Sequence, residues 1–513
     1  MKRWHARITV LMLLGWLGGC AGITSPLPVG RAPEAPVAAP FSAGTVLQAA
    51  LADEVEAAEG RSGFHFLETG EAAYRARLAL IEAAEARIDI QYYIWEFDRS
   101  GRAMTAALTR AADRGVRVRA LIDGFRVDGK AAPLLALARH PNIEVRLYNA
   151  FRTSFRSDVT RYAELLSDFK RLNQRMHDKV LAVDGAAAIV GGRNVSDEYF
   201  GLSEDRYFYD RDVLIAGPMM EDISASFELF WRGDYALPVD WFADAVNGDV
   251  AAGVPPAPDS LPFPLTLSQE ALGAELSRLS QALVWADARL IRTAPGPVFG
   301  EQAPDRDAEI EHAFMERLEA AGSEVVIQMP YITLTPARRE ALRAARDRGV
   351  DVRLHTNSLA STDWTIVQHG YVQERRWLAH WDVALMELKD RPATCCAATV
   401  TPRQTVLHPK TVVFDRQHVF IGSFNLDRRS VLYNSEIALM IDSPALAARV
   451  LDRIGLAMQP ENSWRLVMGE ANQLVWLDET VDPPARFTNA PHTGFFDQLM
   501  PWLGYFLPID RLL

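Results

Sequence analysis

Two histidine–lysine pairs carry residue types that could do chemistry at an anionic centre. His177 and Lys179 are separated by one residue, as are His408 and Lys410, and each pair stands at the start of an apolar run. Alternate side chains of a β-strand point to the same face, so each pair would present an imidazole and an ammonium together. An imidazole can act as a nucleophile when neutral and as an acid when protonated. Positive groups nearby stabilise oxygens that gain charge in a transition state.

Each pair is followed by a predicted hairpin and then by small residues and an asparagine. Residues 180–183 and 187–190 are expected to be strands joined by Asp184-Gly185, a dipeptide favoured in tight turns. Asp415 holds the matching place in the second copy, so we interpret both aspartates as structural. Small residues after the hairpin would let backbone amides and the asparagine amide approach a phosphate closely. The two segments are Gly191-Gly192-Arg193-Asn194 and Gly422-Ser423-Phe424-Asn425.

The two pairs belong to an internal duplication of the chain. Each copy predicts a strand, a helix, a Gly-containing turn and a second strand, which is a β-α-β unit with Val- and Ile-rich buried strands. Gly115 and Gly349 are the corresponding turn residues. The matched sequences are ARIDIQYYIWEF (86–97) with AADRGVRVRALID (111–123), and SEVVIQMPYITL (323–334) with AARDRGVDVRLHTN (344–357).

The complete pattern H-x-K-x4-D-x6-G-(G/S)-x-N occurs twice and resembles the signature of the phospholipase D superfamily. The likeness covers about Leu47 to Leu466. It implies an α/β fold of duplicated α/β/α domains, each with a mixed β-sheet flanked by helices. It also implies pseudo-twofold symmetry, with one active site at the domain interface and no metal or other cofactor.

The resemblance also implies roles for the motif residues. His177 is expected to be the nucleophile that forms a phosphohistidine, and His408 the general acid that later deprotonates the incoming alcohol. The reverse assignment stays open because the two motifs are nearly symmetric. The residues expected to hold the non-bridging oxygens are Lys179, Lys410, Asn194 and Asn425.

A carboxylate behind each histidine would fix its tautomer. Glu436 in the sequence Asn434-Ser435-Glu436 resembles such a partner. Aligning DVLI with EIAL makes Asp212 its counterpart in the first half. A strand-end acid exposed to solvent is the alternative reading of both.

The chain has 513 residues and a formal net charge of -12, with 49% hydrophobic and 23% charged residues. This length is greater than that of a domain with a single hydrophobic core, so we expect two domains. The composition excludes a disordered chain or a polytopic membrane protein. We expect an N-terminal domain over 45–250, a Pro-rich linker over 251–268, a C-terminal domain over 269–470 and an apolar tail over 471–513. The net acidity argues against a nucleic-acid partner bound through its phosphates, and the Arg pairs, Arg428-Arg429 among them, are scattered.

The N-terminus is typical of an exported bacterial lipoprotein. Residues 1–19 have a basic start and a short apolar run, and Leu17-Gly18-Gly19-Cys20 resembles a lipobox in which Cys20 is lipidated. Ordinary signal-peptide cleavage is the alternative. The Pro-rich residues 20–44 would then be a tether, with the protein anchored on the periplasmic side of the cell envelope. The aromatic segment around Phe495 and Phe496 either lies at a membrane interface or docks on the core.

Other candidates are given structural roles. His355 and His369 are expected to be loop or packing histidines, since neither has a metal-ligand neighbour at usable spacing. Cys395 and Cys396 are interpreted as small apolar fillers, and a vicinal disulfide is the rarer alternative.

The superfamily contains phospholipases, phosphatidyltransferases and nucleases, so the motif does not decide the substrate. The sequences at 227–231, 356–371 and 386–388 resemble the cardiolipin synthase C branch. The leading hypothesis is a monomeric phosphatidyltransferase that acts at a membrane surface and makes cardiolipin from phosphatidylglycerol, with phosphatidylethanolamine as a further substrate and retention at phosphorus. The alternatives are a hydrolase that releases phosphatidic acid and, less favoured, an exported nuclease.

Overall fold

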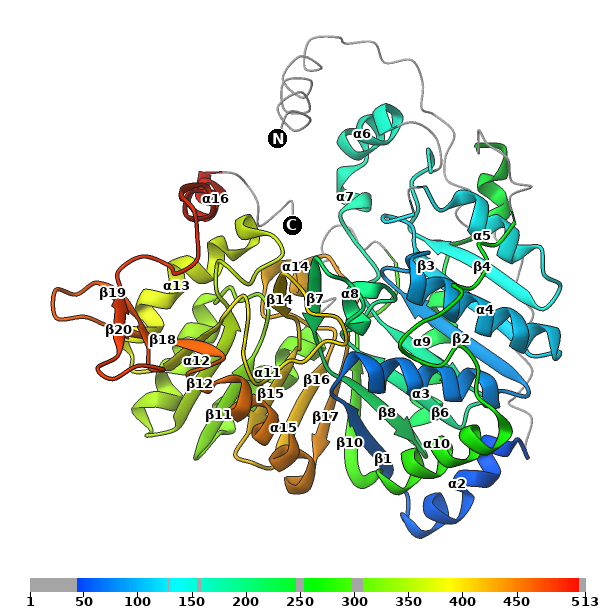
Figure 1. Ribbon diagram of the computed structural model, residues 1–513, viewed down its shortest axis with the longest axis horizontal. Helices are drawn as coiled ribbons and strands as arrows, with labels where there is room; N and C mark the ends of the chain where they lie inside the picture. Colours follow the sequence, from blue (N-terminus) through cyan, green and yellow to red (C-terminus); the bar gives the residue numbers. More distant parts are fainter. Residues whose placement is uncertain (1–43, 128, 155–157, 246–252, 297–307, 507–513) are drawn as a thin grey trace.

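The computed structural model describes residues 44–127, 129–154, 158–245, 253–296 and 308–506. They form two similar α/β units side by side (Figure 1). The predicted signal peptide, the predicted lipidation at Cys20 and the predicted tether up to residue 43 lie outside the described residues. No helix in the described ranges is long and apolar enough to cross a membrane.

The sheet of the first unit has three parallel strands on one side and an antiparallel group on the other. Its order is β9-β4-β3-β2-β5-β6-β8-β1, and the H-x-K segment of the first motif leads into β5. The bounds are β1 Ser62–Leu67, β2 Arg87–Tyr92, β3 Arg117–Asp123, β4 Ile143–Tyr148, β5 Val180–Val183, β6 Ala187–Gly191, β8 Asp212–Ala216 and β9 Ala236–Pro238.

The second unit repeats this order as β18-β13-β12-β11-β15-β16-β17-β10. The repeated order confirms the duplicated α/β fold. β10 also pairs with β1, so it joins the two sheets. The bounds are β10 Val284–Arg292, β11 Glu324–Gln328, β12 Asp351–Asn357, β13 Ala384–Leu388, β15 Thr411–Phe414, β16 His418–Gly422, β17 Ile437–Asp442 and β18 Ser463–Met468.

The crossover helices begin and end where the sequence provides caps. The Asp98 side chain accepts from the amide of Gly101 at the start of α4 (Arg99–Asp113), and Gly115 follows its end with φ +98°. The Thr335 side chain caps α12 (Pro336–Asp347), and Gly349 follows with φ +87°. A side chain disfavours such positive φ values, so glycine provides the turn into the next strand in both copies.

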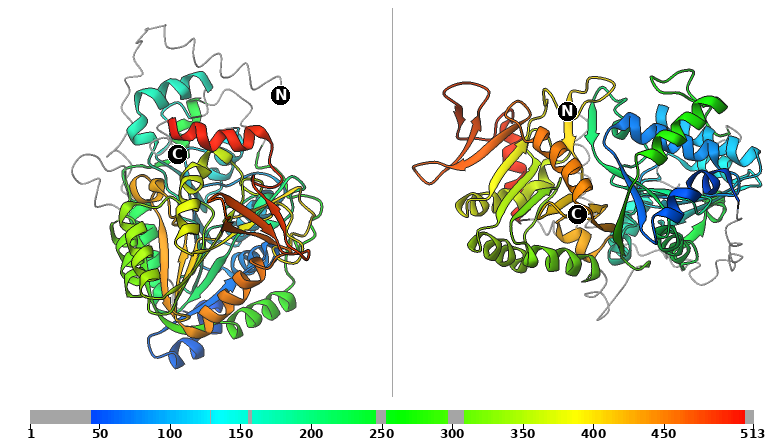
Figure 2. Two further views of the ribbon diagram at one scale, coloured as in Figure 1. Left: turned by 90° about the vertical axis from the view of Figure 1, so that its left-hand side faces the viewer. Right: turned by 90° about the horizontal axis from the view of Figure 1, so that it is seen from below.

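Most helices cover the outer faces of the two sheets, whereas α6 and α16 stand away from the sheets at one end of the molecule (Figures 1 and 2). In the first half they are α2 Val46–Ala57, α3 Gly70–Ala83, α4, α5 Ala131–Ala138, α6 Asp158–Ser167, α7 Phe169–Leu172, α8 Asp197–Phe200, α9 Met219–Trp231 and the 3-10 helix η2 Val239–Ala245. After it come α10 Gln269–Gln281, α11 Ala308–Ala320, α12, the 3-10 helix η5 Thr365–Gln368, α13 His369–His380, α14 Arg428–Leu432, α15 Pro444–Ala457 and α16 Phe495–Phe506.

The two units share a core between their sheets. Val213 and Ile215 of β8 belong to one buried cluster with Ile421 of β16 and Leu439 of β17. A parallel pair, β7 (Arg206–Tyr209) with β14 (Gln404–Leu407), also crosses between the halves. Burial of these apolar surfaces fixes one half against the other, which is what positions a site built from both.

Two predicted domain boundaries differ from the structure. Leu261, Leu265 and Leu267 of the predicted linker and the following α10 pack on the core of the first half, so the second unit begins at β10. The predicted tail begins too early, because β19 (Leu474–Asp478) and β20 (Ala485–Phe487) extend the second sheet beyond β18. Proline content indicated a linker, but apolar contacts decide where the chain lies.

Candidate active site

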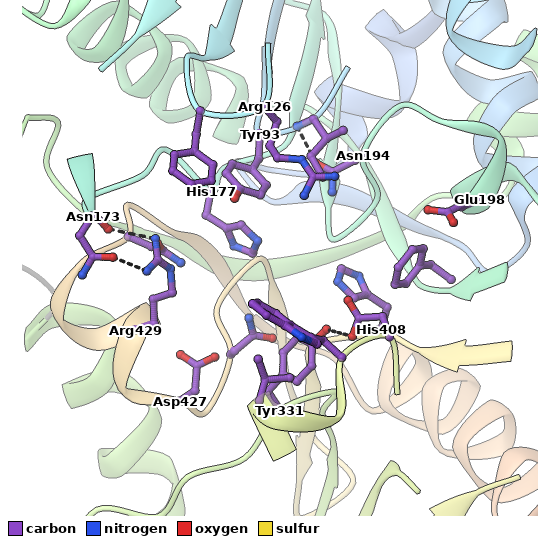
Figure 3. A pocket seen from close by; sticks show the side chains of 18 of the residues that line it. Tyr93, Arg126, Asn173, His177, Asn194, Glu198, Tyr331, His408, Asp427 and Arg429 are labelled. Atoms are coloured by element: carbon purple, nitrogen blue, oxygen red, sulfur yellow. Dashed lines mark hydrogen bonds between the residues drawn. The ribbon is translucent and has the colours of Figure 1, made fainter. Parts of the chain in front are cut away.

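Each motif histidine contacts a carboxylate from the other half of the chain. His177 Nδ1 lies 2.9 Å from Glu436 Oε2, and His408 Nδ1 lies 2.5 Å from Asp210 Oδ2. Figure 3 shows the two imidazoles directed toward each other across a cavity. A carboxylate at Nδ1 holds the proton there and leaves Nε2 available to react. The two halves therefore complete each other's histidine.

Similar aromatic contacts hold the two rings in place. Tyr93 packs edge-on against His177 with ring centroids 5.3 Å apart. Tyr199 and Phe208 pack edge-on against His408 at 5.4 and 5.2 Å. These contacts restrict rotation of the imidazoles and so fix the direction in which each Nε2 points.

The two lysines lie behind the histidines. Lys179 Nζ donates to the carbonyl of His177 and Lys410 Nζ to that of His408, both at 2.6 Å. Burial lowers the pKa of Lys179 to about 7 and that of Lys410 to about 8. Neither lysine is among the described residues that line the cavity, and direct contact of their ammonium groups with phosphate oxygens stays a prediction. Lys179 supplies positive charge from behind the His177 ring, whereas Lys410 Nζ also lies 2.9 Å from Nδ1 and 3.2 Å from Nε2 of His408.

Both imidazoles are neutral at pH 7. Burial and the charge of Lys179 hold the pKa of His177 well below its usual value. Burial and Lys410 lower the pKa of His408 to about 4, although Asp210 opposes this shift. An anionic phosphodiester between the rings would raise both pKa values, because a negative charge favours the protonated imidazole.

The two carboxylates differ in charge state. Burial raises the pKa of Glu436 to about 7. Its oxygens accept from Ser423 Oγ at 2.5 Å, Ser430 Oγ at 2.8 Å and Asn434 Nδ2 at 3.2 Å. For Asp210 burial alone would raise the pKa, but Lys410 and His408 outweigh it and the pKa is lowered. Asp210 thus remains ionised at a pH where Glu436 is half protonated.

The predicted role of Asp212 as the counterpart of Glu436 is wrong. Its carboxylate is fully buried and lies 2.9 Å from Arg77 Nη2 and 3.3 Å from Arg193 Nη1. Asp212 pairs with Gly191 in the β6–β8 ladder, whereas Gly422 pairs with Ala438 in the β16–β17 ladder. The residue that matches Glu436 is therefore two positions earlier, at Asp210.

This correction gives a prediction that separates the two aspartates. Asp210→Asn should lower kcat by about 10²-fold or more, since it removes the charge that orients His408. Asp212→Asn should lower the free energy of unfolding by about 3–5 kcal/mol, because two buried arginines lose a charged partner. Urea denaturation and steady-state kinetics on both variants check this. The opposite pattern would restore Asp212 as the orienting acid.

The small residues after each hairpin make room for these carboxylates. A Cβ on Gly192 would come within 2.4 Å of Asp210 Oδ2, and one on Gly191 within 2.2 Å of Asp212 Oδ1. The amides of Gly422 and Ser423 donate to the carbonyls of Lys410 and Ile437. These backbone amides are used in hydrogen bonds to neighbouring segments of the chain. The prediction had them free to approach a phosphate, so this part of the prediction differs from the structure.

The motif asparagines and aspartates separate into two locations. Asn194 and Asn425 both line the cavity, and the Asn194 amide is held by Ile94 N and the Tyr199 hydroxyl, each at 3.0 Å. Asp184 and Asp415 lie in their turns, where each carboxylate accepts from three consecutive backbone amides, 85–87 for Asp184 and 322–324 for Asp415. They join the turn to the start of a neighbouring strand.

The cavity between the histidines has a volume of about 680 Å³. The sequence motifs did not predict most of its wall, although Asp427 lies two residues after Asn425, the last residue of the second motif, and Arg429 belongs to an Arg pair that the sequence analysis counted as scattered. Arg429 donates to the side chain and carbonyl of Asn173 at 2.7 and 2.9 Å, which ties the two halves at the cavity. The other lining residues include Tyr93, Glu96, Phe125, Arg126, Leu165, Phe169, Leu172, Glu198, Arg206, Phe208, Tyr331, Asp363, Trp364, Val367 and Arg428.

The remaining candidates lie in different surroundings. His355 is fully buried between Gln328 and Ser463, and burial lowers its pKa to about 3. His369 lines the cavity. Cys395 and Cys396 form a vicinal disulfide, so they are bonded to each other besides filling apolar space.

The fold and the paired motifs define a phospholipase D-like protein. The chain matches the family described as "Cardiolipin synthase, PLD-like domain" over residues 78–231 and 314–455, and it belongs to this family. Each matched range contains one complete motif.

Among curated proteins, the chain is 34% identical over 471 residues to cardiolipin synthase C of Escherichia coli, covering 88% of this chain and 97% of that protein. It is 26% identical over 377 residues to cardiolipin synthase B of Shigella flexneri, covering 73% and 75%. A crystal structure of phosphatidylserine synthase from Haemophilus influenzae has the same fold, with a TM-score of 0.53, 14% identity and coverage of 90% and 99%.

Proposed function

We propose that this protein is a phosphatidyltransferase with cardiolipin synthase activity. It transfers a phosphatidyl group from one phospholipid to a hydroxyl of phosphatidylglycerol. The observation that carries the proposal is the pair of histidines, each oriented by a carboxylate of the other half, that face one cavity of about 680 Å³. The named cardiolipin synthases among its relatives support the same activity.

In the first step, His177 Nε2 attacks the phosphorus of the donor lipid and the bond from phosphorus to the leaving alcohol breaks. His408 gives that alcohol a proton, and the phosphatidyl group stays on His177 as a phosphohistidine. Lys179 and Lys410 stabilise the charge that develops on the phosphoryl oxygens, as do the asparagines on the cavity wall.

In the second step, the acceptor hydroxyl loses its proton to His408 and attacks phosphorus, which breaks the bond to His177. Each step is an in-line displacement that inverts the configuration at phosphorus. Two inversions give net retention, and the enzyme returns to its starting protonation state.

The electrostatics support this division of roles between the histidines. A nucleophile must be neutral, and the pKa of His177 lies well below its usual value because of burial and Lys179. A general acid must gain a proton when substrate binds. His408 is the better site for that proton, because its partner Asp210 is the carboxylate whose pKa is lowered.

The cavity wall favours a lipid acceptor over water or nucleic acid. Phe125, Phe169, Leu172 and Trp364 give it apolar surface that can seat acyl-glycerol groups and exclude water. The described arginines of the wall, which are Arg126, Arg206, Arg428 and Arg429, are matched in number by the acids Glu96, Glu198, Asp363 and Asp427. A groove for nucleic acid would need an excess of positive charge.

We further propose that the protein is a lipoprotein of the bacterial cell envelope, anchored through Cys20 on the periplasmic side. The lipobox-like sequence and the Pro-rich residues 20–44 support this location. An enzyme tethered in this way works at the surface that holds its substrates.

The test is an incubation of the purified protein with vesicles of phosphatidylglycerol and phosphatidylethanolamine, followed by mass spectrometry of the lipids. We expect cardiolipin from the wild type and none from His177→Ala or His408→Ala. Phosphatidic acid as the sole product would make the protein a phospholipase D hydrolase. Turnover of single-stranded DNA with no change in lipid would identify a nuclease and overturn the proposal.

A further inference from the structure

Two helices at one end of the molecule expose large apolar side chains to solvent. The four most exposed large hydrophobic residues of the described chain are Leu166 (78%), Phe495 (74%), Phe496 (74%) and Val159 (66%). They belong to α6 of the first half and α16 of the second, which stand at the same end in Figures 1 and 2. The apolar rim is defined here as Val159, Tyr162, Leu166, Trp364, Phe495, Phe496 and Leu503.

Helix α6 has the reverse of the usual amphipathic arrangement. Val159, Tyr162 and Leu166 follow the i, i+3, i+7 spacing of one helix face, and all three are exposed. Glu164 instead points inward, where it is fully buried and bonded to Thr153 and Arg171. An amphipathic helix on the water-exposed surface of a protein usually buries its apolar face and exposes its acidic side chains. The outer face of α6 is therefore built for an apolar partner.

The rim is continuous with the cavity. Leu165, adjacent to Leu166 on α6, lines the cavity wall. Trp364 lines the cavity on the side of the second half and is 50% exposed. It directly precedes η5, on which α16 packs. The exposed apolar side chains thus border the cavity from both halves of the chain.

Positive charge accompanies the apolar surface. Lys170 is exposed on α7, directly after α6, and Arg126 and Arg428 are exposed on the cavity wall. The protein as a whole carries a formal charge of -12, and the acids of the cavity wall match its arginines in number, so these exposed cations offer local contacts for lipid phosphates and not a net positive surface. Aromatic and aliphatic side chains with neighbouring Lys and Arg are the combination that binds anionic lipid headgroups and the acyl boundary below them.

We infer that the apolar rim docks on an anionic phospholipid bilayer and turns the mouth of the cavity toward the lipids. The inference rests on the proposed function, since a lipid substrate has to pass from the bilayer into the cavity. Residues 20–43, which precede the described chain, can span at most about 85 Å when extended. A lipid anchor at Cys20 would therefore leave the rim free to reach the bilayer.

The binding experiment uses the chain from residue 20 onward with Cys20→Ala in every sample, so that neither the apolar run of residues 1–19 nor an acyl anchor contributes. Vesicles of phosphatidylglycerol and phosphatidylethanolamine are floated with the protein. The test variant is Leu166→Glu with Phe496→Glu. The control is Val46→Glu with Val481→Glu, two valines elsewhere that are 51% and 52% exposed. We expect the test pair to lower the partition coefficient by about tenfold or more and the control pair to leave it unchanged.

Turnover distinguishes this inference from the proposed function. The test variant should keep its activity on a monomeric dihexanoyl phospholipid and lose activity on vesicles in parallel with binding. Equal flotation of the test variant and the wild type would overturn the docking inference. An equal loss of flotation in the control variant and the test variant would overturn it as well. The inference would also be overturned if no protein floats, the wild type is a dimer and the test variant is a monomer. The apolar rim would then be the contact between two copies of the chain. If flotation falls as expected but no lipid turns over, docking holds and the proposed function fails.

Discussion

Replacing His177 with alanine should remove both turnover and the covalent intermediate, whereas replacing His408 should remove turnover alone. Each variant is expected to lose about 10³-fold or more of the activity on a natural phospholipid. The reason for the difference is that His177 forms the bond to phosphorus, while His408 moves protons. A poor leaving alcohol needs its proton, so both losses look alike on a natural substrate.

A donor lipid with a p-nitrophenyl headgroup separates the two roles. Its leaving group departs without a proton, so His408→Ala should release one equivalent of p-nitrophenol per active site and then stop. His177→Ala should show no such burst. Stopped-flow absorbance measures the burst, and a ³²P-labelled donor should mark the His408→Ala protein with an acid-labile, base-stable label.

A second histidine–aspartate pair, which lies outside the cavity, provides a control for this experiment. His418 Nδ1 lies 2.5 Å from Asp442 Oδ1 at the start of β16, and neither residue lines the cavity. His418→Ala should leave both burst and turnover near the wild-type level. A burst from His177→Ala and none from His408→Ala would reverse the assignment of nucleophile and acid, because the two motifs are related by the pseudo-twofold arrangement.

The fold could be predicted because its determinants are local. Apolar strands, the caps Asp98 and Thr335, and the turn glycines Gly115 and Gly349 recur in the same order in both halves. The domain limits could not be predicted in the same way. Leu265 and Leu267 pack on the first core although prolines surround them, and composition does not show which apolar surface a segment covers.

The site was predictable where its residues are adjacent in sequence and ambiguous where they are not. The histidine–lysine pairs were predictable because each stands directly before the apolar run of a strand, β5 or β15. Aligning DVLI with EIAL selected Asp212, and that alignment is offset by two residues, which leaves the in-and-out alternation of a strand unchanged, so periodicity did not reveal the error. The ladder register shows that Asp210 corresponds to Glu436, and its hydrogen bond with His408 agrees with that correspondence. The contacts of Glu436 with His177 and of Arg429 with Asn173 cross the halves, and no local pattern reports them.

The dependence of activity on pH should follow from the buried charges and give a narrow optimum near neutrality. Glu436 must be ionised to accept the Nδ1 proton of His177, so kcat/KM should rise with pH through the Glu436 pKa of about 7. The ammonium groups must stay charged, so kcat/KM should fall as Lys179 and Lys410 lose protons, with pKa values of about 7 and about 8. These groups titrate together, so the two limbs report apparent values of the cluster.

Glu436→Gln isolates the acid limb of this profile. Glutamine cannot ionise, so the rise of kcat/KM through pH 7 should flatten, and kcat should fall by about 10²- to 10⁴-fold because the neutral amide no longer holds His177 in one tautomer. A steep acid limb that survives in Glu436→Gln would assign it to another group. The kcat profile should lie at higher pH than that of kcat/KM, because bound phosphodiester raises the pKa of every group around it. Measuring both profiles with monomeric dihexanoyl phosphatidylglycerol removes membrane binding from the comparison, so the displacement reports the charge of the substrate between the two histidines.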